Sequence, residues 1–300
     1  MRAKEQALFI KENISMAAYT TYKTGGAAQY FCLPKNIEEI KQALTFAKEN
    51  KLAFYILGLG SNILVGDLGI KGLVCCLKDF KDIQIKDKQV YALAGTALDK
   101  VIATSVLNNL GGLEKLSGIP GSVGGAVFMN AGAFNGETWE NLISVEVLKD
   151  GQIKTIKKEE VKPSYRKVLG LENCLILSAT WSLTKPADKN LREEILQKRK
   201  QKQPLEYPSA GSVFKRPVGD YASRLIDSCN LRGLTIGGAQ VAKKHAGFII
   251  NYDKASAQDI CDLIKEVQKI VKEKTGFSLE LEQILWGDFK KSVDEIKIKS

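Results

Sequence analysis

SGIPGSVGGAVFMNAGAFNGE, residues 117–137, concentrates glycine beside two small polar residues, Ser122 and Asn130. Its glycines are Gly118, Gly121, Gly124, Gly125, Gly132 and Gly136. Each glycine weakens a regular element by roughly 0.5–1 kcal/mol relative to alanine, so a purely structural segment seldom accumulates so many. A backbone that wraps a large cofactor, and donates amides to its pyrophosphate, accounts for them better.

A second glycine-rich segment, YILGLGSNILVGDLGIKG at residues 55–72, follows an expected short strand that ends at Leu57. Gly58 and Gly60 allow backbone amides to approach an anion closely, and Ser61 and Asn62 add short polar side chains. Taken alone, a GxG after a strand is as readily a tight turn. It is not a Rossmann fingerprint, because the third glycine and the following helix are missing.

Hydrophobic periodicity predicts helices and strands mixed along the chain. A helix is expected with Ile37, Ile40, Leu44 and Ala47 on its inner face, and a second with Leu98, Val101, Ile102 and Leu107 inside. Short strands are expected at 54–58, 73–77, 89–95, 143–149, 152–156 and 175–183. A charged helix follows at 188–202, and a strongly amphipathic one lies around 260–271. The order of the first elements is α/β in character, and a boundary is expected near Lys185 and Pro186.

Composition excludes several classes of protein. With 44% hydrophobic residues in 300, the chain can bury a substantial core, and its apolar runs are too short to cross a bilayer. The N-terminus lacks a long apolar run and a cleavage site, so we expect a cytoplasmic protein. Six cysteines without CxxC spacing and one histidine predict reduced, mostly buried thiols and no metal site. The net charge of +10 is scattered, which favours a solvated basic surface that attracts phosphates over a nucleic-acid site.

Residues 119–137 resemble the flavin-binding signature of the UDP-N-acetylenolpyruvoylglucosamine reductases. Residues 55–72 and TTYKTGGAAQY at 20–30 resemble that family's N-terminal FAD motifs. The resemblance continues through SAGSVFKRP at 209–217, GGAQVAKKHAGFIIN at 237–251 and LELEQILWG at 279–287. It covers nearly the whole chain in order, so we identify the chain as resembling this family.

The resemblance implies an FAD-binding fold of two subdomains, of the PCMH/vanillyl-alcohol-oxidase type, followed by a C-terminal α+β substrate-binding domain. We expect the first at residues 1–187 and the second at 188–300. FAD would be noncovalent, NADPH its reductant and UDP-N-acetylglucosamine enolpyruvate the substrate of a monomer. The expected FAD-binding residues are Gly58, Gly60, Ser61, Asn62, Gly121, Ser122, Gly124, Gly125, Asn130, Gly132 and Ala133.

Reduction of an enolpyruvyl ether needs a group that stabilises developing charge and a group that protonates carbon. By resemblance, Ser212 is the proton donor, Glu282 assists the enol, and Arg166 grips a carboxylate. Each has a plainer interpretation: a turn serine, a strand glutamate facing solvent and a surface arginine. Strand alternation places Glu280 and Glu282 on one face, and only the motif favours Glu282.

Three basic residues, Lys202, Lys215 and Arg216, are predicted to bind the substrate or nucleotide phosphates. Lys202 lies in a basic helix end whose neighbours make its register uncertain, and the family frequently has asparagine where Arg216 stands. The lone histidine, His245, is expected to be structural.

The chain departs from the family pattern at Phe134 and Asn135, and at Lys167 and Val168 after Arg166. The short segment between Arg166 and residue 209 resembles the subtype without an extra insertion. Two rival functions remain open: a sugar or alcohol oxidase with the same FAD fold, which would react rapidly with oxygen, and a basic nucleic-acid-binding protein.

Overall fold

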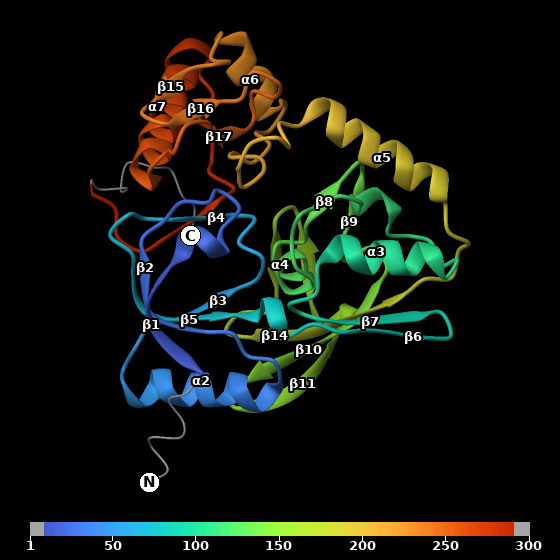
Figure 1. Cartoon of the computed structure of the whole chain (residues 1–300). Helices are drawn as coiled ribbons and strands as arrows, with labels where there is room; N and C mark the ends of the chain where they lie inside the picture. Colours follow the sequence, from blue (N-terminus) through green and yellow to red (C-terminus); the bar gives the residue numbers. More distant parts are fainter. Residues whose placement is uncertain (1–8, 291–300) are drawn as a thin grey trace. The chain divides into compact units, whose positions relative to one another are not determined.

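The structure is a computed structural model that describes residues 9–290 (Figure 1). Its contacts divide the chain into two compact units built from interleaved segments. Unit 1 contains residues 9–11, Phe31–Leu59 and Leu73–Arg199, and unit 2 contains Glu12–Tyr30, Gly60–Gly72 and 200–290. The C-terminal segment of unit 2 therefore begins at Lys200, and two N-terminal segments join it.

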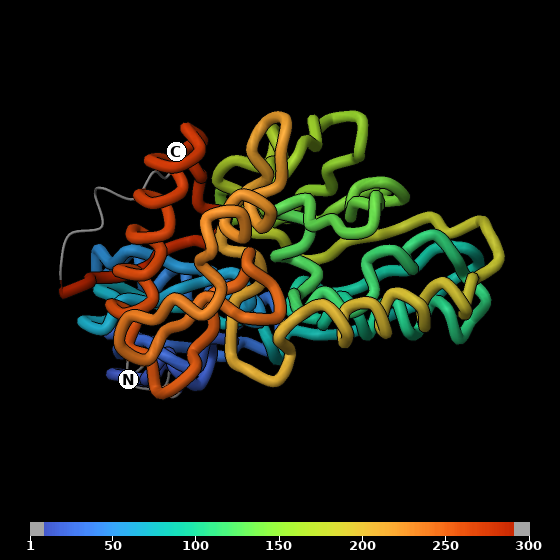
Figure 2. Tube along the Cα trace, turned by 90° about the horizontal axis from the view of Figure 1, so that it is seen from above, coloured from blue at the N-terminus to red at the C-terminus, as the bar shows by residue number. Residues whose placement is uncertain are grey.

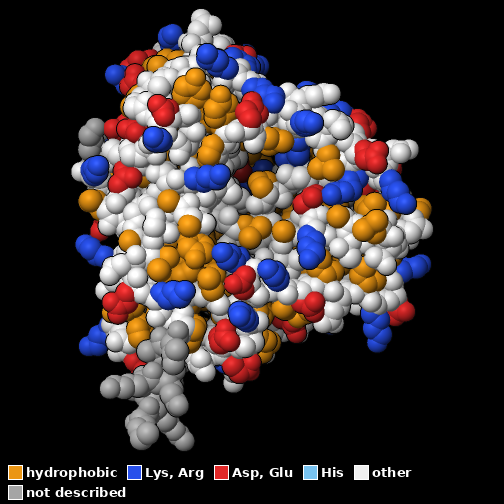
Figure 3. Space-filling view, viewed as in Figure 1, with side chains coloured by type: hydrophobic (Ala, Val, Ile, Leu, Met, Phe, Trp, Pro, Cys, Tyr) orange, Lys and Arg blue, Asp and Glu red, His pale blue; other side chains and the backbone are white. Residues whose placement is uncertain are grey.

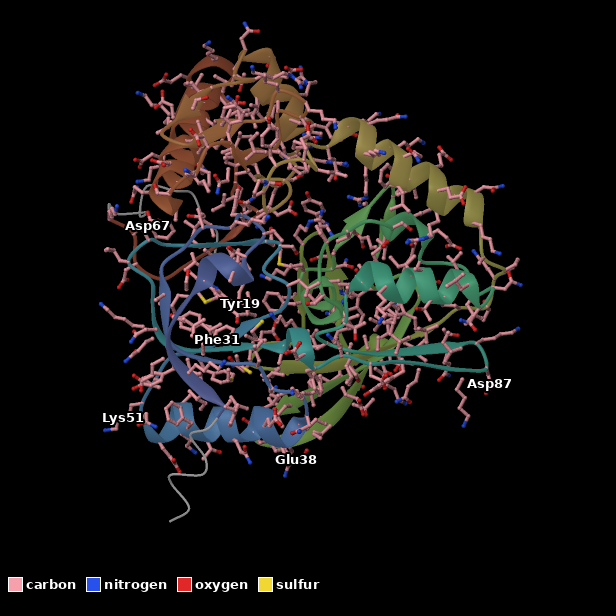
Figure 4. The ribbon with its side chains drawn as sticks, in the orientation of Figure 1. Tyr19, Phe31, Glu38, Lys51, Asp67 and Asp87 are labelled. Carbon is pink, nitrogen blue, oxygen red and sulfur yellow. The ribbon has the colours of Figure 1, made fainter. Side chains whose placement is uncertain are left out.

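A five-stranded antiparallel sheet forms the larger part of unit 1, with the strand order β11-β10-β14-β7-β6. The strands are β11 (Gln152–Lys157), β10 (Leu142–Lys149), β14 (Leu175–Ser182), β7 (Gln89–Leu93) and β6 (Ile83–Lys86). Figure 4 shows Asp87 at the tip of the β6–β7 hairpin. These strands confirm the sequence predictions for 89–95, 143–149, 152–156 and 175–183.

Helices α3 (Leu98–Leu107) and α4 (Val123–Phe128) pack on this sheet, α3 against β7 and α4 against β14 (Figure 1). Leu98, Val101 and Ile102 are buried as predicted. The prediction for Leu107 is wrong, because its exposed fraction is 80%. Nine residues separate it from Leu98, which at 100° per residue places it on the opposite side of the helix, and Val106 is buried instead.

A second sheet has the order β1-β2-β5-β3, and its members are β1 (Ile10–Ser15), β2 (Ala27–Cys32), β5 (Ile70–Cys76) and β3 (Phe54–Leu57). Within unit 1, β3 pairs in parallel with β5, and α2 (Ile37–Glu49) comes before β3 in the chain. Asn36 caps α2 by accepting from the Glu39 amide. Figure 4 shows Glu38 and Lys51 at opposite ends of this helix.

Two short hairpins and one long helix complete unit 1. The hairpins are β8 (Gly132–Ala133) with β9 (Gly136–Glu137), and β12 (Lys162–Ser164) with β13 (Lys167–Leu169). Helix α5 (Lys189–Lys202) runs beside α3 in both Figure 1 and Figure 2, and Arg192 on α5 forms two hydrogen bonds with Asp99 on α3. The charged helix expected at 188–202 is confirmed.

Unit 2 is organised around α7 (Ala257–Thr275), whose predicted apolar stripe is buried. Ser256 and Asp259 form a capping box at its start, and Gly276 ends it in the left-handed conformation. The other elements are α6 (Ala222–Ser228), β15 (Thr235–Ile236), β16 (Ala239–Val241), β17 (Ile249–Asn251), and the parallel pair β4 (Ile63–Val65) and β18 (Ile284–Trp286). Short 3-10 helices occupy Met16–Tyr19, Leu77–Asp79, Glu114–Leu116 and Lys158–Glu160.

The next findings, on disulfides, metal-ligand clusters and membrane-spanning helices, hold for residues 9–290. All six cysteines are free, and five are buried while Cys174 is half-buried. Within those residues no cluster of three potential metal-ligating side chains occurs, and no helix is both long and apolar enough to cross a bilayer. On the face drawn in Figure 3, Lys and Arg side chains are interspersed with Asp and Glu, which gives no support to a nucleic-acid surface.

Candidate active site

Gly58, directly after β3, lies against Ser122 in unit 1. A Cβ built on Gly58 would stand 2.2 Å from the Ser122 Oγ and 3.1 Å from its Cβ. No φ forces glycine here, since Gly58 is absent from the positive-φ set of the described chain. The two predicted glycine loops therefore meet at this point, and only a residue without a side chain allows so close an approach.

The backbone around this contact offers unused donors. Among residues 9–290, no amide of Gly58, Leu59, Gly121 or Ser122 donates to a protein acceptor. In unit 2, the amides of Gly60, Ser61 and Asn62 likewise donate to no protein acceptor within residues 9–290. These residues are half-buried or buried. Orphan amides at glycine positions are the donor set that a pyrophosphate requires, so the residues fit a dinucleotide such as FAD.

The amides at the start of α4 are used differently. Ser122 caps this helix by accepting from the Gly125 amide at 3.3 Å, while the amides of Val123 and Gly124 donate to the carbonyls of Thr96 and Ala94, each at 2.8 Å. Gly124 and Gly125 therefore serve close packing and capping through their own amides. The prediction that they bind the cofactor is not tested by these contacts.

Asn130 holds the second half of the loop together. Its side chain is fully buried, and its Nδ2 donates to Glu137 Oε2 at 2.8 Å and to the Ser164 carbonyl at 3.1 Å. Its Oδ1 accepts from the Trp139 amide. Because Ser164 ends β12, these bonds fasten the β12–β13 hairpin to the glycine-rich loop.

Arg166 lies in the two-residue turn of that hairpin, with a φ of 57°. Its guanidinium donates to the carbonyls of Gly132 at 3.2 Å and Asn130 at 3.5 Å, and it stands 4.9 Å from the Tyr165 ring. Lys167 and Val168, the departures from the family pattern, pair within the hairpin without displacing the arginine. The structure thus brings Arg166 to Gly132 of the predicted flavin loop.

The other departure from the family pattern, Phe134 and Asn135, lies in the β8–β9 turn. Phe134 and Asn135 have φ of 50° and 59°, the values of a type I′ hairpin turn. A bulky residue is strained there. Arg199 on α5 is 8% exposed, and its guanidinium carbon lies 5.4 Å from the Phe134 ring. The Arg199 Nε donates to the Ser117 carbonyl. Helix α5 therefore contacts and supports the turn.

In unit 2, Ser212 is exposed and follows Gly211, whose φ is 73°. The residue after Ser212 is held by two backbone hydrogen bonds: the Val213 amide donates to the Gly247 carbonyl at 3.0 Å, and the Val213 carbonyl accepts from the Glu282 amide at 2.8 Å. The structure therefore brings together the two segments that carry Ser212 and Glu282.

Glu280 and Glu282 are the two glutamates of this segment. Leu279 and Leu281 are buried, as the predicted alternation requires, and Glu280 and Glu282 are both half-buried. Lys215 Nζ lies 2.5 Å from Glu280 Oε1 and the Lys215 amide donates to the Glu280 carbonyl. Glu280 thus takes part in an ion pair within unit 2, and the family motif, not a difference in partners, favours Glu282.

Asn62, predicted to contact FAD, also contacts the Glu282 segment within unit 2. Its Nδ2 donates to the Glu282 carbonyl at 3.2 Å, and its carbonyl accepts from the Ile284 amide at 2.9 Å. These bonds begin the parallel pairing of β4 with β18. Sequence reasoning missed this contact, because 220 residues separate Asn62 and Glu282 and no local pattern couples them.

The three residues predicted to bind phosphates differ in their exposure and in their contacts. Lys202 is exposed at the end of α5. Arg216 is exposed, with its guanidinium carbon 4.4 Å from the Tyr221 ring. Lys215 has its charge partly neutralised by Glu280.

His245 packs at 4.9 Å, edge-on, against Phe248, and its Nδ1 accepts from the Gly247 amide. Burial, followed by the charge of Arg232, lowers the pKa of His245 below its ordinary value. The imidazole is therefore held neutral in a structural position.

Two models of known protein families match this chain. A model of the FAD binding domain matches residues 28–157, and a model of the C-terminal domain of UDP-N-acetylenolpyruvoylglucosamine reductase matches residues 203–286. The UDP-N-acetylenolpyruvoylglucosamine reductase of Clostridium novyi is 45% identical over 284 residues, 93% of this chain and 92% of that protein. The one from Listeria monocytogenes is 42% identical and covers 97% of this chain and 99% of its own.

A solved structure gives the same result at the level of the fold. The crystal structure of the Thermus caldophilus reductase superposes with a TM-score of 0.80 at 34% identity, and the match covers 93% of this chain and all of that one. Since relatives well above 30% identity match along nearly the entire chain, the chain belongs to the UDP-N-acetylenolpyruvoylglucosamine reductase family.

Proposed function

We propose that the chain reduces UDP-N-acetylglucosamine enolpyruvate to UDP-N-acetylmuramate during synthesis of peptidoglycan precursors, with NADPH as reductant and noncovalent FAD as cofactor. The observation that carries this proposal is the 45% identity over 93% of the chain to a reductase of that name. The orphan amides of the two glycine loops support the cofactor assignment, because they match the needs of a pyrophosphate.

FAD, when bound, supplies the hydride that NADPH has delivered to it. The amides of Gly58, Gly60, Ser61, Asn62, Gly121 and Ser122 would hold its phosphates. Gly124, Gly125, Asn130, Gly132 and Ala133 would shape the loop around it, as their packing and hydrogen bonds suggest.

Addition of hydride to the terminal vinyl carbon of the substrate leaves negative charge on the carbon that bears the carboxylate. Ser212 would donate its hydroxyl proton to that carbon, which is basic enough to accept a proton from an ordinary alcohol. Glu282 would assist the enol form, and Arg166 would bind the substrate carboxylate through two parallel hydrogen bonds.

Lys202 and Arg216 are the proposed contacts for nucleotide phosphates, because both are exposed cations. Lys215 is the third proposed phosphate contact, and its ammonium also forms an ion pair with Glu280. We also propose a monomer, and the cytoplasm as its location, where both nucleotide substrates would be available.

The test follows the colour of the flavin without oxygen. Purified protein should show a flavin absorbance spectrum that bleaches with NADPH and returns when the enolpyruvyl nucleotide is added. A sugar or alcohol oxidase of the same fold would instead regain its colour rapidly with oxygen and not with the nucleotide. A correctly folded protein that never takes up FAD would overturn the proposal.

A further inference from the structure

Gln283 is a buried polar residue next to Glu282, and its exposed fraction is 2%. Its Nε2 donates to the Ala210 carbonyl at 3.1 Å and to the Gly211 carbonyl at 3.4 Å. Its Oε1 accepts from the Tyr22 hydroxyl at 3.0 Å. Every hydrogen-bonding group of this carboxamide is therefore engaged in the interior of unit 2.

The two carbonyls that Gln283 holds belong to the residues directly before Ser212. Gly211 has a φ of 73°, and no atom lies within 4 Å of the position where its Cβ would be, so Gly211 itself has no side-chain packing. The neighbouring Ala210 is packed in the core of unit 2, and hydrogen bonds constrain the turn further. Gln283 supplies them on one side of Ser212, and the bond from Glu282 to the Val213 carbonyl supplies them on the other.

The two carbonyls of the turn fix the orientation of the carboxamide. Carbonyls can only accept, so Nε2 must face Ala210 and Gly211, and Oε1 then faces the Tyr22 hydroxyl, which donates to it. Tyr22 is fully buried, and its backbone carbonyl accepts from Asn251 Nδ2 at 2.9 Å. Burial raises the pKa of the Tyr22 hydroxyl far above its ordinary value.

We propose that Gln283 is a positioning residue for the protonation step: its carboxamide ties the Ala210–Gly211 turn that presents Ser212 to the segment that carries Glu282, directly before β18. This inference rests on the proposed roles of Ser212 and Glu282. Its consequence is specific, because a misplaced Ser212 should slow proton transfer to the substrate and leave reduction by NADPH unaffected.

The test uses three variants of the FAD-loaded protein in anaerobic stopped-flow experiments. Gln283→Met keeps the length and removes the hydrogen bonds. Gln283→Glu keeps the shape, and only its protonated form can donate to the Ala210 carbonyl while it accepts from Tyr22. Tyr22→Phe removes one donor and leaves the bonds to the turn in place.

Gln283→Met should slow reoxidation by the enolpyruvyl nucleotide on the order of 10- to 100-fold, with reduction by NADPH within about twofold of the unaltered chain. Gln283→Glu should show a reoxidation rate that rises as pH falls, because protonation restores the donor. Tyr22→Phe should have the smallest effect. The solvent deuterium isotope effect on reoxidation should increase in Gln283→Met, since the proton step becomes slower.

The outcomes separate the inference from the proposed function. If the unaltered chain is not reoxidised by the nucleotide, the proposed function fails. If Ser212→Ala is slow but Gln283→Met is as fast as the unaltered chain, only the positioning role fails. Equal slowing of both half-reactions, or a Gln283→Glu variant without the new pH dependence, would mean that Gln283 merely supports the fold. Should Gln283→Met fold poorly, the pH profile of Gln283→Glu alone decides.

Discussion

Lys215 and Glu280 form an ion pair, with Nζ 2.5 Å from Oε1, beside the backbone pairing that brings the Ser212 segment to the Glu282 segment. Strand alternation alone makes Glu280 and Glu282 equivalent, and the family motif selects Glu282. Glu282→Gln should slow reoxidation by the enolpyruvyl nucleotide roughly 100-fold or more, because it removes a group that interacts with developing charge. Glu280→Gln is the matched control and should lower stability with a much smaller change in rate. The reverse pattern would transfer the role to Glu280.

Asn62 is proposed to bind the FAD phosphates through its backbone amide, and its side chain donates to the Glu282 carbonyl. Asn62→Ala removes the donor to the Glu282 carbonyl but keeps the backbone amide and carbonyl of residue 62. We expect FAD affinity to fall by less than about tenfold, since amides carry that contact, and reoxidation to slow by about tenfold. FAD titration and stopped-flow kinetics measure the two effects. A loss of FAD binding with a normal rate in the loaded protein would assign Asn62 to the cofactor alone.

Gly58 should tolerate no side chain as long as Ser122 stands opposite. Gly58→Ala places a Cβ 2.2 Å from the Ser122 Oγ, an overlap expected to cost about 1–3 kcal/mol and to weaken FAD retention. Ser122→Ala in the same chain removes that oxygen, so the double variant should recover stability relative to Gly58→Ala. Thermal unfolding with and without added FAD measures this. If the double variant is less stable than Gly58→Ala, the overlap with the Ser122 Oγ is not the cause of the destabilisation.

Arg166 joins the β12–β13 hairpin to the Gly132 carbonyl, and in the proposed reaction it binds the substrate carboxylate. Arg166→Lys keeps the charge but cannot make two parallel hydrogen bonds, so kcat/KM for the nucleotide should fall by roughly one to two powers of ten. Reduction by NADPH should change little. Unaltered steady-state kinetics in this variant would return Arg166 to a purely structural role.

His245 should give stability a pH dependence. Its folded-state pKa is depressed from the ordinary 6.5, chiefly by burial, so the unfolded chain binds a proton more readily. The free energy of unfolding should therefore decrease as pH falls through 6.5 and below. His245→Gln should show a smaller decrease over the same range in urea titrations. An identical pH dependence in both proteins would contradict the neutral, buried imidazole.

Local patterns were sufficient to predict the longest helices and strands of the fold. The apolar periods of α2 and α7 and the strands β7, β10, β11 and β14 lie where the sequence places them. The prediction failed for Leu107, at a helix end where the apolar stripe has already turned away from the sheet. Within the glycine-rich residues 117–137, Val123–Phe128 form a short helix that the composition does not indicate, because the Ser122 cap and the Ala94 carbonyl satisfy two of its first amides.

Only the parts of the candidate site that lie in family motifs could be predicted from the sequence. The two glycine loops and the Ser212 and Glu282 segments were identified from sequence, and the structure pairs the latter two within unit 2. The ion pair between Lys215 and Glu280, and the contacts that join Tyr22 to Gln283 across 261 residues, depend on long-range pairing. Nothing in a local window indicates that a buried glutamine meets a tyrosine so far away in the chain.

Single-turnover reoxidation of NADPH-reduced Ser212→Ala by the enolpyruvyl nucleotide tests the central claim most directly. We expect its flavin to bleach with NADPH at the rate of the unaltered chain and to regain its colour at least 100-fold more slowly, because the proton donor is gone. Recovery of colour at the normal rate, or equal slowing of both steps, would contradict the account.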